Sequence, residues 1–209
     1  MRYLLSSLCL LFVACGSYSK KQNLQIEKAS TRSIQNLYFS DTSKDYVYKA
    51  NIAIYDNDFS GIFIVKKIGE ANHRIVFTTE MGNKIFDFSF INDTFKVNFI
   101  LEDMDKAILI NILKHDFKAL IQEEIPVVTS YSLQDTLVYE TTILNKKHFY
   151  FKTQQLDKII RVGNGKEKVT FLFSEINDTI ANQIRILHSN IKLNINLKSI
   201  CMSVNNHNP

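Results

Sequence analysis

The residue types that most often carry chemistry are scattered in this 209-residue sequence. Its five histidines, His73, His115, His148, His188 and His207, form no HxH, HExxH or mixed Cys/His pattern, so no metal site is predicted. No GxSxG nucleophile motif is present. Gly165-Lys166 resembles the end of a phosphate-binding loop, but Glu167 stands where Ser or Thr is needed, which favours a hairpin turn. We therefore expect no catalytic residues, no metal, no cofactor and no enzymatic activity.

The cysteine with the most informative surroundings is Cys15. It follows Met1–Ala14, in which Arg2 is the only charge and Tyr3–Ala14 is a mostly apolar stretch of 12 residues. That length is too short to span a membrane and is typical of a signal peptide. Cys15 with Gly16 resembles a bacterial lipobox, although Phe12 and Val13 differ from its usual first two residues. The pattern predicts a signal peptide over 1–14 and lipid attachment at Cys15; the alternative is an ordinary secretory signal.

Acylation would have a physical consequence for the mature chain. Fatty acids such as palmitate contribute about 0.8 kcal/mol per buried CH₂, and several chains anchor a protein stably. Gly16 stands where Asp favours inner-membrane retention in many bacterial lipoproteins, so we expect an outer-membrane, periplasm-facing location. Cys9 leaves with the signal peptide, so Cys201 has no partner for an intrachain disulfide.

The composition is that of an ordinary globular protein. Hydrophobic residues make up 45% and charged residues 22%, and the net charge of +4 is too small to predict nucleic-acid binding. With 15 Phe and 9 Tyr but only 6 Gly and 2 Pro, long β-strands are favoured. The length suggests one domain, or at most two small ones.

Hydropathy patterns divide the chain into three parts after the signal peptide. Residues 15–44 read as a tether that could contain a short helix around Ile34–Tyr38, residues 45–202 as the folded domain, and 203–209 as a polar tail. Helical spacing predicts one long helix over Asp103–Glu123. Period-two alternation predicts eleven strands, five before the helix and six after it. They are Tyr46–Tyr55, Phe59–Ile68, Arg74–Glu80, Lys84–Ile91, Thr94–Leu101, Thr136–Leu144, Lys147–Thr153, Lys158–Val162, Lys168–Ser174, Ile180–His188 and Ile191–Ile200.

An antiparallel sheet this wide must curl or split. We predict an α+β, mainly antiparallel fold in which the sheet curls into an open half-barrel and the helix forms a lid over its concave face. A phenylalanine-lined trough would suit an acyl chain. The alternative is that these aromatic residues form an ordinary sandwich core. The expected cavity residues are Phe63, Phe86, Phe88, Phe95, Phe99 and Phe149.

The order of parts between Tyr46 and Met202 resembles the outer-membrane receptor of the lipoprotein-sorting pathway, the LolB-like family, and more loosely its periplasmic carrier LolA. The resemblance rests on the pattern of His73–Val97, Lys158–Ser174 and Ile180–Ile200. It implies an open β-barrel, lidded by helices, whose cavity holds the acyl chains of client lipoproteins. It also places Met81-Gly82 at a hairpin that contacts the membrane during lipid delivery; the alternative is that Met81 folds back locally.

Two hypotheses from different classes follow. The first is a monomeric outer-membrane lipoprotein that binds acyl chains or other apolar cargo and receives or inserts lipoproteins. Its partners would be the membrane, through Cys15, and client lipoproteins or their acyl chains. The alternative is a structural or assembly lipoprotein that docks a protein partner without lipid cargo. A hydrolase ranks third, since it would need polar residues clustered in a cleft.

Overall fold

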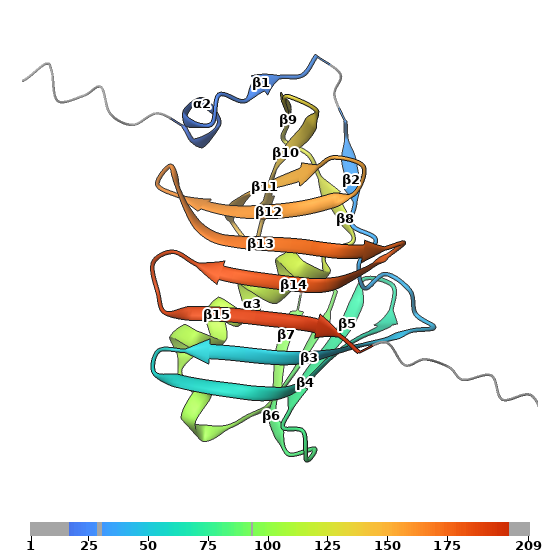
Figure 1. Ribbon diagram of the computed structural model, residues 1–209, viewed down its shortest axis with the longest axis vertical. Coiled ribbons are helices and arrows are strands. Elements are labelled where there is room, and N and C mark those ends of the chain that lie inside the picture. Colours follow the sequence, from blue (N-terminus) through green and yellow to red (C-terminus); the bar gives the residue numbers. More distant parts are fainter. Residues whose placement is uncertain (1–16, 29–30, 93, 201–209) are drawn as a thin grey trace, which may run out of the picture.

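A computed structural model describes residues 17–28, 31–92 and 94–200 (Figure 1). The expected signal peptide, Cys15, Cys201 and the polar tail lie outside these residues. The described part contains no helix with the length and apolar character needed to cross a membrane.

Most of the described chain forms one antiparallel sheet of thirteen strands, in the order β1-β9-β10-β11-β12-β13-β14-β15-β3-β4-β5-β6-β7. The first half consists of β3 (Asp45–Ile54), β4 (Asn57–Gly69), β5 (Asn72–Thr78), β6 (Lys84–Ile91) and β7 (Thr94–Ile100). The second half consists of β9 (Thr129–Leu133), β10 (Thr136–Ile143), β11 (Lys146–Lys152), β12 (Leu156–Gly163), β13 (Lys166–Asn177), β14 (Ile180–His188) and β15 (Leu193–Ser199). β15 pairs with β3 and joins the halves, whereas β7 and β1 (Gln25–Ile26) form the two edges, so the barrel is open.

The predicted class, mainly antiparallel β with an open sheet and one long helix, is confirmed, but the strand count is wrong. All eleven predicted strands are present, and the described residues contain fifteen in total. The additional strands are β1, β9, β2 (Ser33–Gln35) and β8 (Glu124–Pro126), and the last two pair with each other in a small second sheet. These strands have two to five residues, too few for alternation to be recognised in the sequence.

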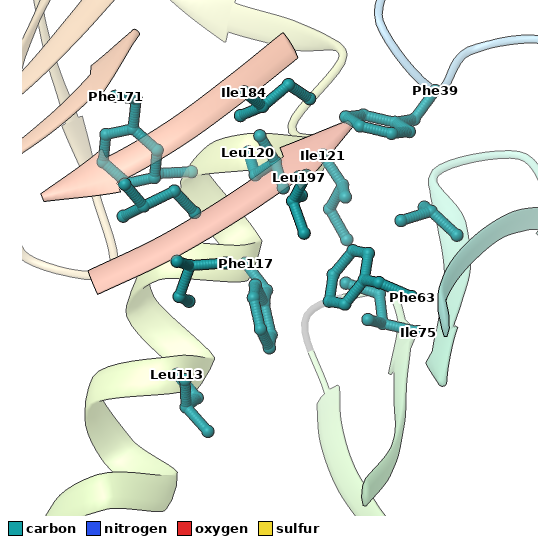
Figure 2. Close-up of a cluster of buried hydrophobic side chains, with 14 of the residues drawn as sticks. Phe39, Phe63, Ile75, Leu113, Phe117, Leu120, Ile121, Phe171, Ile184 and Leu197 are labelled. Atoms are coloured by element: carbon teal, nitrogen blue, oxygen red, sulfur yellow. The ribbon is translucent and has the colours of Figure 1, made fainter. Parts of the chain in front are cut away.

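The long helix, α3 (Ala107–Ile121), lies in the hollow of the curled sheet, preceded by the 3₁₀ turn η2 (Glu102–Met104). Its apolar residues lie between strands of the two sheet halves (Figure 2), with Phe171 and Ile184 on one side and Phe63 and Ile75 on the other. The wide apolar arc of α3 explains this position, because a helix that is apolar over most of its surface must be buried.

The centre of the hollow is filled by side chains. The Phe117 ring of α3 lies 5.4 Å from the ring of Phe63 and 5.6 Å from that of Phe86, between centroids. All three residues are fully buried. The helix therefore occupies the concave face as part of the core, and open space is confined to its ends.

The N-terminal segment packs on the outer face of the sheet. Tyr18 of the short helix α2 (Tyr18–Lys21) and Leu24, which precedes strand β1, belong to a second, smaller apolar cluster with side chains of β9–β12 such as Tyr131 and Phe149. Further along, Asn36, Tyr38 and Phe39 are buried against the main core. The described residues of the predicted tether (15–44), which are 17–28 and 31–44, thus include two stretches that pack on the domain.

Candidate functional site

The six phenylalanines expected to line a cavity do not lie together. Phe63, Phe86 and Phe88 are fully buried around Phe117, and Phe95 is partly buried against Phe88, with ring centroids 5.3 Å apart. These four belong to or pack on the main core on the concave side of the sheet.

Phe99 is separated from them by a β-bulge. The register between β6 and β7 shifts between Asp87 and Phe88, which sets Phe99 opposite Asp87 and leaves it 41% exposed. Asp87 accepts hydrogen bonds from Arg74, Lys84 and Asn98, and the Arg74 guanidinium holds the pKa of its carboxyl at about 2. Phe99 therefore lies beside a polar cluster and not in the apolar interior.

Phe149 faces the opposite side of the sheet from the concave core. Its neighbour Tyr150 donates a hydrogen bond to the Ala119 carbonyl of α3 at 3.2 Å, and alternate side chains of a strand point to opposite faces. The Phe149 ring instead contacts Tyr18 of α2, with centroids 4.6 Å apart.

The open space lies at the N-terminal end of α3. A pocket of about 420 Å³ is enclosed by the β3–β4 hairpin, η2, the first two turns of α3 and the loop before β15. Its apolar lining residues are Ile54, Phe59, Met104, Leu109, Ile112, Ile191 and Leu193. This volume is within the range of about 300–1,000 Å³ typical of small-molecule sites.

The mouth of this pocket combines exposed apolar side chains with a few polar ones. Ile108 is 74% exposed and Tyr55 is 62% exposed, and both line the pocket. Asn57, Asp103 and Lys106 supply the polar groups. Such a site suits a ligand with an apolar body and a polar end.

Sequence reasoning missed this pocket because it is assembled from turns and element ends, whereas the prediction followed the strand-centre phenylalanines. One signal was available: Tyr55 is a large apolar residue at the end of a predicted strand, and Ile108 is another in the second turn of the predicted helix. A second pocket of similar volume lies at the other end of α3 and is lined mainly by polar and charged residues such as Lys67, Glu70 and Glu123. It is a poorer candidate for apolar cargo.

A buried ionic cluster connects α3 to the sheet near the middle of the helix. Arg161 Nη1 of β12 donates to Asp116 Oδ1 at 2.9 Å. His188 Nε2 of β14 makes an ion-pair contact with Asp116 Oδ2, also at 2.9 Å. The other ring nitrogen of His188 lies 3.0 Å from the Leu193 carbonyl oxygen.

This cluster was not predicted, because residues far apart in the sequence form it. A signal was present, since Asp116 is the only acidic residue within the helix sequence AILINILKHDFKALI. A carboxylate on the apolar arc of a helix is expected to need a buried partner.

The other described histidines are perturbed by burial. Burial lowers the pKa of His148 to about 4 and lowers the pKa of both His73 and His115. His148 Nδ1 lies 2.9 Å from the Lys146 carbonyl, to which it donates in the neutral ring, and His73 Nε2 lies 3.0 Å from the Phe39 carbonyl. Over residues 17–28, 31–92 and 94–200, no three His, Cys, Asp or Glu side chains are grouped so that they could hold a metal ion.

Met81 lies at the tip of the β5–β6 hairpin and is 91% exposed. The tip is closed by hydrogen bonds from the Thr79 amide to the Asn83 carbonyl at 2.8 Å and from the Gly82 amide to the Thr79 carbonyl at 3.0 Å. Gly82 has a φ of +87°, a conformation that non-glycine residues rarely adopt. The Met81 side chain therefore projects from a defined turn and does not fold back onto the sheet.

Comparisons with known proteins identify structural relatives only. No family model and no curated protein matches the chain. It is similar to the solved structure of a LolA superfamily protein from Nitrosomonas europaea, with 10% identity and a TM-score of 0.45 over 79% of this chain and 88% of that one. It is also similar to a DUF1329 family protein from Desulfovibrio piger, with 9% identity and a TM-score of 0.42 over 77% of this chain and 85% of that one.

Proposed function

We propose that the protein is a lipid-anchored bacterial lipoprotein of the outer membrane that holds acyl chains or other apolar cargo in the pocket at the N-terminal end of α3. Cys15 would carry the anchor, and the domain would face the periplasm and receive or insert lipoproteins. The observation that carries the proposal is the apolar pocket whose rim exposes Tyr55 and Ile108. The protein would act by binding, without catalysis.

The pocket can enlarge if the first turns of α3 move. Lys106 at the N-cap makes no side-chain capping hydrogen bond, and Ala107 and Ile108 of the first turn are exposed. The second half of α3 is held by Asp116 and Phe117. A helix end without a cap and with few buried residues opens at low free-energy cost. A long acyl chain would therefore displace the start of α3 and leave its end in place.

Cargo binding can be tested with a fluorescent fatty acid and the chain carrying Cys15→Ser. Leu109→Trp adds bulk to the pocket wall, whereas Asn111→Trp adds the same side chain at an exposed position of the same helix outside the pocket. We expect Leu109→Trp to weaken binding at least tenfold and Asn111→Trp to leave it unchanged, with both variants showing native circular dichroism. Equal binding by the two variants would contradict the pocket assignment.

Anchoring and cargo can be tested on protein purified from bacterial membranes. Mass spectrometry should show a mature N-terminus at an acylated Cys15 and lipid released from the native protein. A mature chain without acyl groups would overturn the anchor. One stoichiometric crosslinked protein without released lipid would instead support the structural or assembly alternative.

A further inference from the structure

We infer that one end of the half-barrel is a docking surface for an anionic phospholipid bilayer, and that the N-terminal segment holds the lipid anchor beside it. This surface, the lysine-rich rim, comprises α2 (18–21) and the tips of the β10–β11 (144–147), β12–β13 (164–168) and β14–β15 (189–192) hairpins. The inference rests on the proposed acylation of Cys15 and adds an orientation that the anchor alone does not provide.

Strand registers place these three hairpin tips at the same end of the sheet. Lys147 pairs with Val162 just before the β12–β13 tip, and Val169 just after that tip pairs with His188 at the end of β14. Leu193 after the β14–β15 tip pairs with Ile54, so the β3–β4 hairpin ends there as well. In Figure 1 the β12–β13, β14–β15 and β3–β4 tips lie along the left side, with α2 at the upper left.

The N-terminal strap, Ser17–Ile26, is held at both of its ends. Tyr18 is buried against Phe149, and its hydroxyl donates to Glu167 Oε1 at 2.8 Å. Lys21 Nζ donates to the Gly165 carbonyl at 3.3 Å. At the far end, β1 pairs with β9 through Gln25 and Ile26. The strap therefore begins beside the β12–β13 tip and runs across the outer face of the sheet.

This arrangement restricts where the anchor can be. Cys15 is two residues before Ser17, so at most about 7 Å of extended chain separates their Cα atoms. A free tether over residues 15–44 would have a root-mean-square reach of roughly 30 Å and would allow any orientation. Because the strap is docked, acyl chains on Cys15 would enter the bilayer next to the lysine-rich rim.

The charge of the rim matches an anionic lipid surface. Its four segments contain seven lysines and one glutamate, although the net charge of the whole chain is only +4. Six of these lysines are exposed: Lys20, Lys21, Lys146, Lys147, Lys166 and Lys192. The one glutamate, Glu167, accepts the Tyr18 hydroxyl hydrogen bond. A basic cluster next to an acyl anchor is a common combination for stable membrane attachment.

The pocket lies at the same end, beside the β3–β4 tip. The β5–β6 hairpin turns back further from that end, since Thr78 pairs with Ile62 in the middle of β4 and Glu80 forms an ion pair with Lys49 in the middle of β3 at 3.0 Å. The pocket mouth is flanked by Asp56 and Asp103, so the lysine-rich part of this end would make the first contact with the anionic surface. Docking would then hold the mouth close to the bilayer, where apolar cargo can leave without crossing water.

Binding to vesicles tests the surface independently of acylation. We would use the chain carrying Cys15→Ser and vesicles of equal parts phosphatidylglycerol and phosphatidylcholine, compared with pure phosphatidylcholine. Lys146→Glu combined with Lys166→Glu should weaken binding to the anionic vesicles at least tenfold. The matched control, Lys66→Glu with Lys198→Glu, makes the same charge change at the other end of the barrel and should alter binding less than twofold. Equal losses in the two double variants, or equal binding to both vesicle types, would overturn the docking surface.

Orientation is tested on the acylated protein in a Cys201→Ser background. A fluorophore is attached at Asn190→Cys on the rim or at Asn177→Cys at the opposite end of the sheet, and quenching by brominated lipid is compared. We expect quenching at position 190 only, and loss of this difference when Tyr18→Ala releases the strap. Equal quenching at both positions would overturn the inference while leaving cargo binding intact. Loss of fatty-acid binding with normal vesicle docking would instead refute only the cargo proposal.

Discussion

Arg161 of β12 donates a 2.9 Å hydrogen bond to Asp116 of α3, across the interface between the helix and the sheet. Asp116 is fully buried and the Arg161 side chain is nearly so. With the His188 ring 2.9 Å from the other carboxylate oxygen, side chains of β12 and β14 both contact this one helix residue. The cluster sets the position of α3 in a core whose other contacts are mostly apolar and non-directional.

Loss of the Asp116 charge should destabilise the protein strongly. Asp116→Asn leaves Arg161 buried without its counter-charge, and we expect the free energy of unfolding to fall by about 3 kcal/mol. The matched control is Asp45→Asn, which removes the 2.7 Å surface pair with Lys66 and should cost less than about 1 kcal/mol. Urea denaturation followed by circular dichroism measures both. A loss for Asp116→Asn no larger than that of the control would show that the cluster does not hold α3.

Stability should decrease in mild acid because His148 is buried in its neutral form. Burial lowers its pKa to about 4, whereas an unfolded histidine titrates near 6.5. The unfolded state therefore takes up the proton first, so the stability is complete above about pH 6.5 and is lost as the pH falls toward 4. We expect a decrease on the order of 1 kcal/mol per pH unit in this window.

Urea denaturation at several pH values measures this slope, and His148→Asn provides the comparison. The variant keeps an N–H group near the Lys146 carbonyl but does not titrate. The free energy of unfolding of this variant should fall less steeply with decreasing pH than that of the parent protein. Some pH dependence should remain, because burial lowers the pKa of His73 and His115 as well. Identical slopes would exclude His148 as a source of the acid sensitivity.

Two glycine substitutions should differ sharply. A Cβ on Gly61 would lie 1.9 Å from the Thr78 carbonyl oxygen on the neighbouring strand, so Gly61→Ala must push β4 and β5 apart. We expect a loss of about 3 kcal/mol in the free energy of unfolding. A Cβ on Gly82 would have no other atom within 4 Å. Gly82→Ala should therefore lower the free energy of unfolding only by the cost of holding alanine at a positive φ, about 1 kcal/mol. Thermal denaturation should rank the two variants in this order, and a reversed order would contradict the close approach at Gly61.

Met81 should affect lipid delivery without affecting stability. Because its side chain is exposed, Met81→Ser should change the free energy of unfolding by less than about 0.5 kcal/mol. It should slow the transfer of a fluorescent acylated peptide from the protein to vesicles several-fold. Ile68→Ser is the control, since Ile68 is an exposed apolar residue near the β4–β5 turn at the other end of the barrel. Equal transfer rates for the two variants would argue against membrane contact by Met81.

The prediction from sequence was most successful where a single periodicity ran through an element. The alternation in β15 and β3 and the helical spacing of Leu113 and Phe117 were sufficient to predict these elements. It was least successful where side-chain direction depends on a neighbouring strand. By sequence, Phe99 belongs to the apolar face of β7 together with Phe95 and Val97. A β-bulge instead sets it opposite Asp87, and no local pattern in the sequence shows where a bulge lies.

The sequence by itself determined the class of fold, the order of the long strands, the one long helix and the expectation of a lipid anchor at Cys15. These depend on residue type and on spacing within a few residues, which act locally. Only the tertiary structure decided that Phe117 fills the hollow, that Phe149 contacts Tyr18 on the outer face, and that Asp116 meets Arg161 and His188. These contacts join residues 45 to 131 positions apart, and the packing of the whole sheet around α3 determines which of the possible contacts form.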